Sequence, residues 1–385
     1  MNPFVFNTTR SIAFGTGISA ELGQRAGKLL GNSVLVVTDP GIRRLGLAQP
    51  ALASLAEAGI EVAIFDQVEA DPSVETVHAA MEAGHQKGAT GIVGFGGGSS
   101  LDVAKLVALL LGSGEDIDGA WGLSNAKGPR LPLVLVPTTA GTGSEVTPIS
   151  IMTVGDEKRG VVSPVILPDL AVLDPQLTVG LPAAITAATG VDAMVHAIEA
   201  YTSKGANNNP LSKMLARQAL QLLGANIETA VHKGSDIEAR GAMLLGSLLA
   251  GQAFANSPVA AVHALAYPLG GTFHVPHGLS NALVLPHVLR FNAPAAAHLY
   301  AEIAADVFPH LASEEGAQGR CGAFIEELAA LAVRLGMQTT LREVGITEAD
   351  LGKLAADAMI QQRLLVNNPR EVSEADAYAI YRAAL

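Results

Sequence analysis

The sequence predicts an α/β N-terminal domain with a parallel sheet, followed by an all-α C-terminal domain. In the first part of the 385 residues, short apolar runs alternate with amphipathic stretches that have a helical period. After about Leu181 the strand-like runs stop, and alanine-rich helical periodicity continues to the last residue. Because strands alternate with helices, parallel pairing through right-handed crossovers is expected.

The elements of the first part follow from runs of β-branched and apolar residues bounded by Gly, Asn, Asp or Pro. In order, they are a strand at 32–39, a helix at 46–59, a strand at 61–68, a helix at 73–88, a strand at 89–98, a helix at 99–114 and a strand at 131–139. The turn "DPQLTVGLPAA" marks the end of this part. We therefore expect two domains, 1–180 and 181–385.

Composition and charge limit the classes of partner. The net charge of -12 argues against binding to nucleic acid or to an anionic membrane, because both carry negative phosphates. A small metabolite is the better expectation. The single cysteine, Cys321, cannot form an internal disulfide, and the N-terminal residues lack a basic segment followed by an apolar run. These features predict a cytoplasmic protein.

One long segment, 241–289, contains no Asp, Glu, Lys or Arg. Its apolar part resembles a membrane span but is interrupted by Gln252, Asn256 and Pro258 within the length that a span needs. A buried helix in the core of a soluble domain is therefore predicted. The same segment carries His263, His274, His277 and His287, and buried imidazoles need polar partners.

Two loops of the first domain have the composition of a phosphate-binding site. In "GFGGGSSLDVAK", residues 94–105, three consecutive glycines follow a strand and precede a helix, so backbone N–H groups can approach a pyrophosphate. The pattern differs from GxGxxG, and a tight turn explains the glycines equally well when they are taken alone. In "PTTAGTGSEVTP", Thr138, Thr139, Thr142 and Ser144 follow the next strand. Both loops fall at the carboxyl ends of strands, where open parallel sheets bind ligands.

Asp39 ends the first strand of this series, in "VLVVTDPG". In nucleotide-binding sheets a carboxylate at this place accepts hydrogen bonds from the adenosine ribose, and it repels a 2′-phosphate. The alternative is a helix N-cap or an Asp-Pro turn. Beside the glycine-rich loop, Asp39 favours NAD over NADP.

A candidate metal site combines two helical positions with histidines from the uncharged segment. Asp192 and His196 lie four residues apart in "GVDAMVHAIEA", so a helix places them on one face. His263, in "AAVHALAYPL", and either His277 or His274, in "FHVPHG", would complete a set of one carboxylate and three imidazoles. Such a set suits a divalent transition metal. The alternative for each histidine is a core residue bonded to a carbonyl.

Four motifs, "GGGSSLDVAK", "PTTAGTGSE", "GVDAMVHAIEAY" and "HALAYPLGGTFHVPHG", together resemble the iron-containing alcohol dehydrogenases, relatives of glycerol dehydrogenase and dehydroquinate synthase. The resemblance spans essentially the whole chain. It implies a Rossmann-like dinucleotide-binding domain at 1–180 and a helical metal-binding domain at 181–385, as in dehydroquinate synthase.

The resemblance also assigns site residues. The metal positions are Asp192, His196, His263 and His277, which selects His277 over His274. The resemblance implies Fe²⁺ as the metal, with Zn²⁺ as the alternative. The NAD positions are Asp39, Gly97, Gly98, Ser99, Thr138, Thr139 and Thr142, and more loosely Thr147, Lys158, Leu177 and Gly180. Phe254 matches a position that lines the substrate pocket.

By this resemblance the protein transfers a hydride between NAD(H) and a small alcohol and its aldehyde or ketone, as a homodimer or higher oligomer. Alternatives are a hydroxy-acid dehydrogenase, a maleylacetate-type reductase, a lyase like dehydroquinate synthase, and a non-catalytic nucleotide- or metal-binding protein. One residue departs from several relatives. Tyr267 stands one helical turn after His263, where they have a second histidine. We interpret it as a wall of the nicotinamide pocket, with a proton donor as the alternative.

Overall fold

The computed structural model describes residues 3–155 and 157–385 and divides the chain into two compact units. One unit consists of Asn7–Thr139 and Gly143–Val179. The other consists of Gly180–Leu385 together with Ala140–Thr142 and the described residues up to Phe6.

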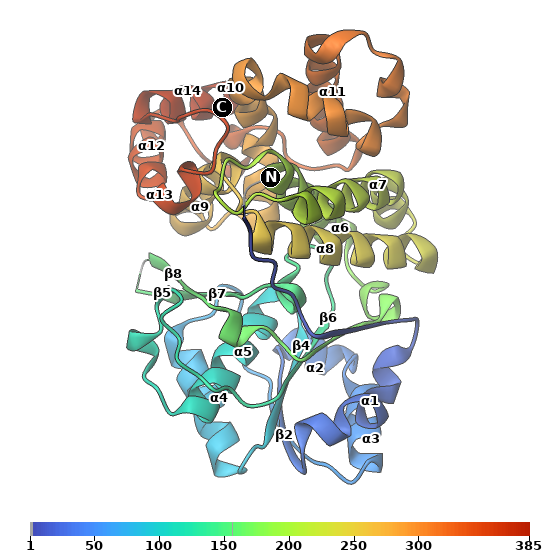
Figure 1. Cartoon of the computed structure of the whole chain (residues 1–385). Helices are drawn as coiled ribbons and strands as arrows, with labels where there is room; N and C mark the ends of the chain where they lie inside the picture. Colours follow the sequence, from blue (N-terminus) through green and yellow to red (C-terminus); the bar gives the residue numbers. More distant parts are fainter. Residues whose placement is uncertain (1–2, 156) are drawn as a thin grey trace. The chain divides into compact units, whose positions relative to one another are not determined.

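The first unit is built on a parallel sheet of six strands in the order β1-β9-β6-β4-β2-β3 (Figure 1). The strands are β1 (Ser11–Phe14), β2 (Ser33–Val37), β3 (Glu61–Phe65), β4 (Gly91–Gly96), β6 (Leu133–Pro137) and β9 (Leu170–Leu173). A second, three-stranded sheet is formed by β5 (Gly122–Leu123), β7 (Ile149–Val154) and β8 (Glu157–Val162). The sequence predicted β2, β3, β4 and β6, and missed the other strands.

Helices cover both faces of the larger sheet, as the apolar runs require. The helices are α1 (Leu22–Leu30), α2 (Pro40–Leu45), α3 (Gln49–Glu57), α4 (Val74–Gln86) and α5 (Gly98–Ser113). Side chains alternate along β2, so Leu35 and Val37 join one buried cluster while Val34 and Val36 join another. Both clusters are closed to water, which is why the strand reads as a continuous apolar run.

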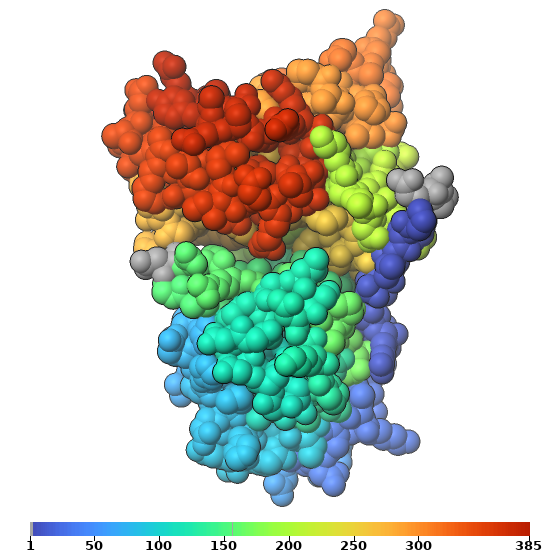
Figure 2. All heavy atoms as spheres, turned by 60° about the vertical axis from the view of Figure 1, so that its left-hand side comes forward, coloured from blue at the N-terminus to red at the C-terminus, as the bar shows by residue number. Residues whose placement is uncertain are grey.

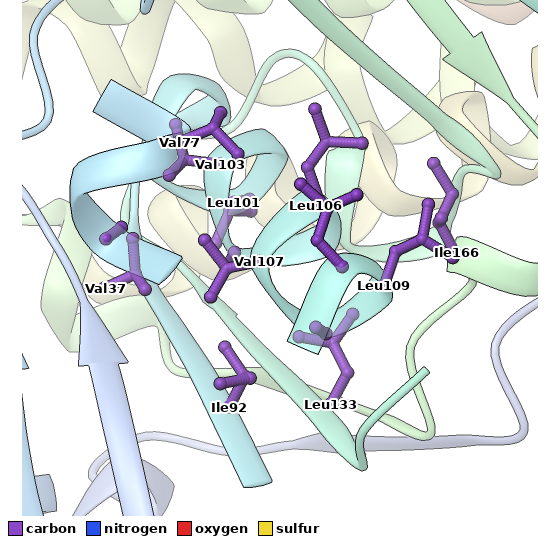
Figure 3. Close-up of a cluster of buried hydrophobic side chains, with 14 of the residues drawn as sticks. Val37, Val77, Ile92, Leu101, Val103, Leu106, Val107, Leu109, Leu133 and Ile166 are labelled. Atoms are coloured by element: carbon purple, nitrogen blue, oxygen red, sulfur yellow. The ribbon is translucent and has the colours of Figure 1, made fainter. Parts of the chain in front are cut away.

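The cluster on the α4 and α5 side is the larger of the two and is drawn in Figure 3. Val107 of α5 lies toward Ile92 of β4, and Leu109 of α5 lies toward Leu133 of β6. Burying such side chains contributes about 1.5–3 kcal/mol each. The packing fixes the start of α5 at the carboxyl end of β4.

The second unit is helical (Figure 1). Its helices are α6 (Ala183–Thr202), α7 (Pro210–His232), α8 (Ile237–Asn256), α9 (Ala261–Phe273), α10 (His277–Val307), α11 (Gly316–Arg334), α12 (Leu351–Met359), α13 (Gln362–Leu365) and α14 (Glu374–Ala384). The C-terminal residues, coloured red in Figure 2, form one continuous mass of atoms, in which α14 packs against α12 and α10.

The uncharged segment 241–289 forms most of α8, all of α9 and the first half of α10. Most of the α8 side chains are buried within the unit, as the sequence predicted. Among the described residues, no helix combines the length and the hydrophobicity that crossing a membrane needs.

Candidate functional site

The predicted cofactor loops follow three neighbouring strands of the six-stranded sheet. From β2 the chain goes first to β3 on one side and then to β4 on the other, so the strand order reverses between β2 and β4. Asp39 follows β2, Gly97 follows β4 and Thr138 follows β6. Ligands of open α/β sheets bind at such a switch point, outside the carboxyl ends of the strands.

Asp39 caps α2 with one oxygen and faces the glycine-rich loop with the other. Its Oδ1 accepts hydrogen bonds from the N–H groups of Gly41 at 2.8 Å and Ile42 at 3.0 Å. Its Oδ2 lies 3.3 Å from the place that a Cβ on Gly96 would take. The N-cap alternative for Asp39 is therefore correct, and it leaves Oδ2 beside the candidate phosphate loop.

At Gly96, the first of the three consecutive glycines, the glycine-rich loop leaves no room for a side chain. Gly96 has φ 154°, and a Cβ there would lie 2.7 Å from Ser100 Oγ. Gly97 is the N-cap of α5, and among the described residues no side chain caps the helix there. The N–H groups of its first turn are thus left for another acceptor, and the helix dipole makes that acceptor preferably an anion.

A buried lysine, which was not predicted from the sequence as a site residue, holds the second loop in place. Lys105 of α5 is fully buried, and its Nζ donates to Ser144 Oγ at 2.8 Å and to the Ile149 carbonyl at 2.6 Å. Burial lowers the pKa of Lys105, against the opposing effect of Asp102 and Glu145. These bonds tie α5 to the loop between β6 and β7.

The remaining predicted cofactor residues have other partners or lie in the other unit. The hydroxyl of Thr147 also accepts from Lys105 Nζ, at 3.2 Å. Lys158 Nζ pairs with Asp71 at 2.6 Å and donates to Thr153. Leu177 is buried in the apolar cluster that contains Val34 and Val36 of β2. Ser99 lies in the first turn of α5 and Thr139 in the loop after β6, whereas Thr142 and Gly180 belong to the helical unit.

The four predicted metal ligands lie together within the helical unit. Asp192 and His196 come from α6, His263 comes from α9, and His277 is the first residue of α10. One donor atom from each lies within 4.8 Å of the others. Asp192 Oδ1 is 3.5 Å from His277 Nε2 and 3.9 Å from His263 Nε2. His274 is exposed in a left-handed conformation (φ 55°) at the end of α9 and is not part of this group.

The charges at this group favour a cation. Burial alone would raise the pKa of Asp192, but the three imidazoles and an amide of Asn281 together hold it below the ordinary value. Burial lowers the pKa of His196 to about 3, although Asp192 opposes the shift. At neutral pH the group is therefore an ionised carboxylate beside a neutral His196, which is the protonation that metal binding requires.

Each of the three imidazole ligands contacts a neighbouring side chain that is not a ligand. Glu199 is buried, accepts from His263 Nδ1 at 2.7 Å, and also accepts from the N–H groups of Ala260 and Val262. This bond leaves His263 Nε2 facing the other ligands. Phe254 stacks on His196 with ring centroids 4.2 Å apart, and Tyr267 lies 5.9 Å from the His277 ring.

Two family profiles cover most of the chain. "Iron-containing alcohol dehydrogenase" matches residues 9–175, and "Fe-containing alcohol dehydrogenase family, C-terminal" matches residues 186–385. The chain belongs to the iron-containing alcohol dehydrogenase family.

Individual relatives agree with this assignment. The chain is 41% identical to long-chain-alcohol dehydrogenase 1 of Geobacillus thermodenitrificans, over 96% of this chain and 94% of that protein. It is 36% identical to the NAD-dependent methanol dehydrogenase of Bacillus methanolicus, over 96% and 97% of the two chains. The crystal structure of a 1,3-propanediol oxidoreductase matches all of both chains with a TM-score of 0.96 and 37% identity.

The family assignment confirms three predictions: the family resemblance, the fold class, and an enzyme of the alcohol dehydrogenase class. Glu199 and Asn281 were not predicted from the sequence. Their spacing from predicted ligands could have indicated both residues. Glu199 is three residues after His196 and Asn281 is four residues after His277, so each shares a helix face with a ligand.

Proposed function

We propose that this chain is an NAD- and metal-dependent dehydrogenase that transfers a hydride between NAD(H) and a small alcohol and its aldehyde or ketone. The observation that carries the proposal is the convergence of Asp192, His196, His263 and His277 in a largely apolar part of the helical unit. A set of three imidazoles and one carboxylate fits a divalent transition metal.

The metal would be held by these four side chains, with Fe²⁺ as our proposal and Zn²⁺ as the alternative. A bound ion supplies Lewis acidity to the alcohol or carbonyl oxygen. Residues of the chain would orient the ligands and supply the negative charge of the ligand set. Glu199 keeps the proton of His263 on Nδ1, and Asp192 supplies the negative charge of the ligand set. No nucleophile is required, because the cofactor carries the hydride.

For NAD we propose the residues at the carboxyl ends of β2, β4 and β6. The backbone of Gly97, Gly98 and Ser99 would bind the pyrophosphate, and Thr138 and Thr139 would line the next loop. The uncapped start of α5 supports this assignment. Thr142, Thr147, Leu177 and Gly180 remain part of the proposal. Lys158 would have to exchange its Asp71 partner to take part.

Asp39 is proposed to select NAD over NADP. The Asp39→Asn variant is expected to raise the ratio of NADP to NAD use by at least about tenfold, because it removes a charge worth on the order of a few kcal/mol beside the 2′-phosphate. Asparagine caps a helix as well as aspartate does, so α2 should be retained. Steady-state kinetics with both cofactors measures the ratio. An unchanged ratio would place the ribose away from Asp39.

Phe254 and Tyr267 are proposed as walls of the substrate and nicotinamide pocket, because both rings lie against ligand imidazoles. Burial raises the pKa of Tyr267, so the phenol stays protonated at neutral pH. We expect Tyr267→Phe to keep most of the turnover. If turnover falls by about two orders of magnitude while metal and NAD still bind, the phenol is a general acid or base instead.

The decisive experiment on function is a panel of alcohols, diols, hydroxy acids and aldehydes, assayed with NAD(H) and Fe²⁺ and followed by absorbance of the reduced nicotinamide. Turnover of simple alcohols is expected. Turnover of hydroxy acids alone would favour the hydroxy-acid alternative. Binding of NAD and metal without turnover of any member would favour a non-catalytic protein.

We further propose a homodimer in the cytoplasm. Strand β1 ends the six-stranded sheet, and in the described part of the chain no strand pairs with its outer edge. Ile12 and Phe14 on β1 and Leu29 beside it are 38%, 44% and 38% exposed. An apolar, unpaired edge is a template for a second strand. Sedimentation analysis is expected to give twice the 39.4 kDa of the chain, and a monomer at micromolar concentration would refute the dimer.

A further inference from the structure

Asn281 lies where three of the four candidate metal ligands meet. It belongs to the second turn of α10 and is completely buried. Its Nδ2 donates to Asp192 Oδ1 at 2.6 Å, and lies 3.3 Å from His277 Nε2 and 3.4 Å from His263 Nε2. One amide nitrogen therefore faces acceptors from α6, α9 and α10.

The amide nitrogen of Asn281 donates a hydrogen bond, whereas its carbonyl oxygen accepts none from the described residues. Its amide carries two hydrogens for three acceptors, and its Oδ1 is buried without a hydrogen-bond partner among the described residues. Asn292, a buried asparagine further along the same helix, is bonded on both sides. Its Nδ2 donates to Asn368 Oδ1, and its Oδ1 accepts from Asn368 Nδ2. A side chain that served only to hold the core together would be expected to resemble Asn292.

We propose that Asn281 is a positioning residue of the metal centre, which fixes the rotation of the Asp192 carboxylate so that Oδ1 faces His263 and His277. The inference rests on the proposed metal site. A carboxylate oxygen has lone pairs for both an N–H donor and a cation, whereas each imidazole Nε2 has one. The bond to Asp192 is thus compatible with a bound metal, while the longer contacts to the imidazoles give way.

The test compares the two buried asparagines of α10. Asn281→Leu removes the donor at similar volume, and Asn292→Leu is the matched control far from the ligands in the sequence. Competition with a chelating dye measures the affinity for Co²⁺. We expect Asn281→Leu to bind Co²⁺ about 10- to 100-fold more weakly than the wild type. The control should stay within about threefold of the wild-type affinity, even if it unfolds at lower temperature.

A second readout is the visible spectrum of the Co²⁺-loaded proteins, which reports the geometry of the ligands. We expect it to change in Asn281→Leu and to match the wild type in Asn292→Leu. If Asn281→Leu does not fold, Asn281→Ser takes its place. The serine hydroxyl can still donate a hydrogen bond, but it reaches less far than the asparagine amide. We expect the Co²⁺ affinity of this variant to lie between those of the wild type and Asn281→Leu.

Two results would overturn the inference, and they are distinguishable. If the wild type binds Co²⁺ and the Asn281 variants bind it with the same affinity and spectrum, Asn281 does not position the carboxylate, while the proposed function stands. If the wild type itself binds no Co²⁺ or Fe²⁺, the proposed metal site and this inference fail together.

Discussion

The Asp192→Ala variant is expected to bind no metal and to lose at least about three orders of magnitude in turnover. Asp192 is the only carboxylate in the group of four, and its charge is what offsets that of a cation there. The Lewis acidity that a bound ion supplies is worth several kcal/mol at the transition state. A loss of about 4 kcal/mol is a loss of about a thousandfold in rate. Metal analysis of the purified protein and steady-state kinetics with NAD measure the two effects.

The fold should survive this change, because Asp192 interacts with the other ligands and Asn281 rather than with structural groups. Asp174→Ala is the control for removing a buried carboxylate. Asp174 is buried and accepts from the N–H groups of Gly17 and Ser19, so its loss should lower stability but leave the metal content intact. One metal per chain and normal turnover in Asp192→Ala would refute the proposed ligand set.

Gly278→Ala is expected to destabilise the protein by about 3 kcal/mol and to weaken metal binding, although Gly278 is not a ligand. A Cβ at Gly278 would lie 2.2 Å from the backbone oxygen of Ala188 and 2.6 Å from its carbonyl carbon. Neither atom can move independently of α6, so the start of α10 must shift, and it carries His277. Thermal unfolding and Co²⁺ affinity are the measurements.

Gly271→Ala separates this steric effect from the general effect of replacing a helical glycine. Gly271 lies in α9, and in the part of the chain that the structure describes a Cβ there would have no neighbour within 4 Å. The change should therefore leave metal binding unaltered and stabilise the helix by up to about 1 kcal/mol. If Gly278→Ala behaves in the same way as Gly271→Ala, the packing of α10 on α6 does not determine the position of His277.

The sequence predicted four strands of the six-stranded sheet, including β3 at one edge, and missed β1 at the other edge and the buried β9 beside it. Strand β2 has both faces covered, so its residues form a long apolar run that periodicity detects. Strand β1 has four residues, none of them fully buried, and it exists because β9 supplies its hydrogen bonds. Strand β9 is equally short. Pairing between Ser11 and Leu170 is a long-range event, and no local pattern contains it.

For the candidate site, the sequence predicted which residues share a face of one helix. It did not predict the contacts between different helices. The four-residue separation of Asp192 and His196 placed them on one face of α6, as the structure shows. The residues alone could not choose between His274 and His277. The difference is that His274 ends α9 in a left-handed conformation, whereas His277 begins α10. Where one helix stops and the next starts depends on packing that the sequence does not display.

The four candidate ligands belong to helices that are brought together only when the chain folds, and this has a thermodynamic consequence. The unfolded chain holds these donors far apart, so an ion that binds the folded site binds the unfolded chain much more weakly. At a free metal concentration of about a thousand times Kd, mass action would add about 4 kcal/mol to the free energy of unfolding. The melting temperature of this protein would then not be a fixed constant, because it would rise and fall with the supply of free metal ion.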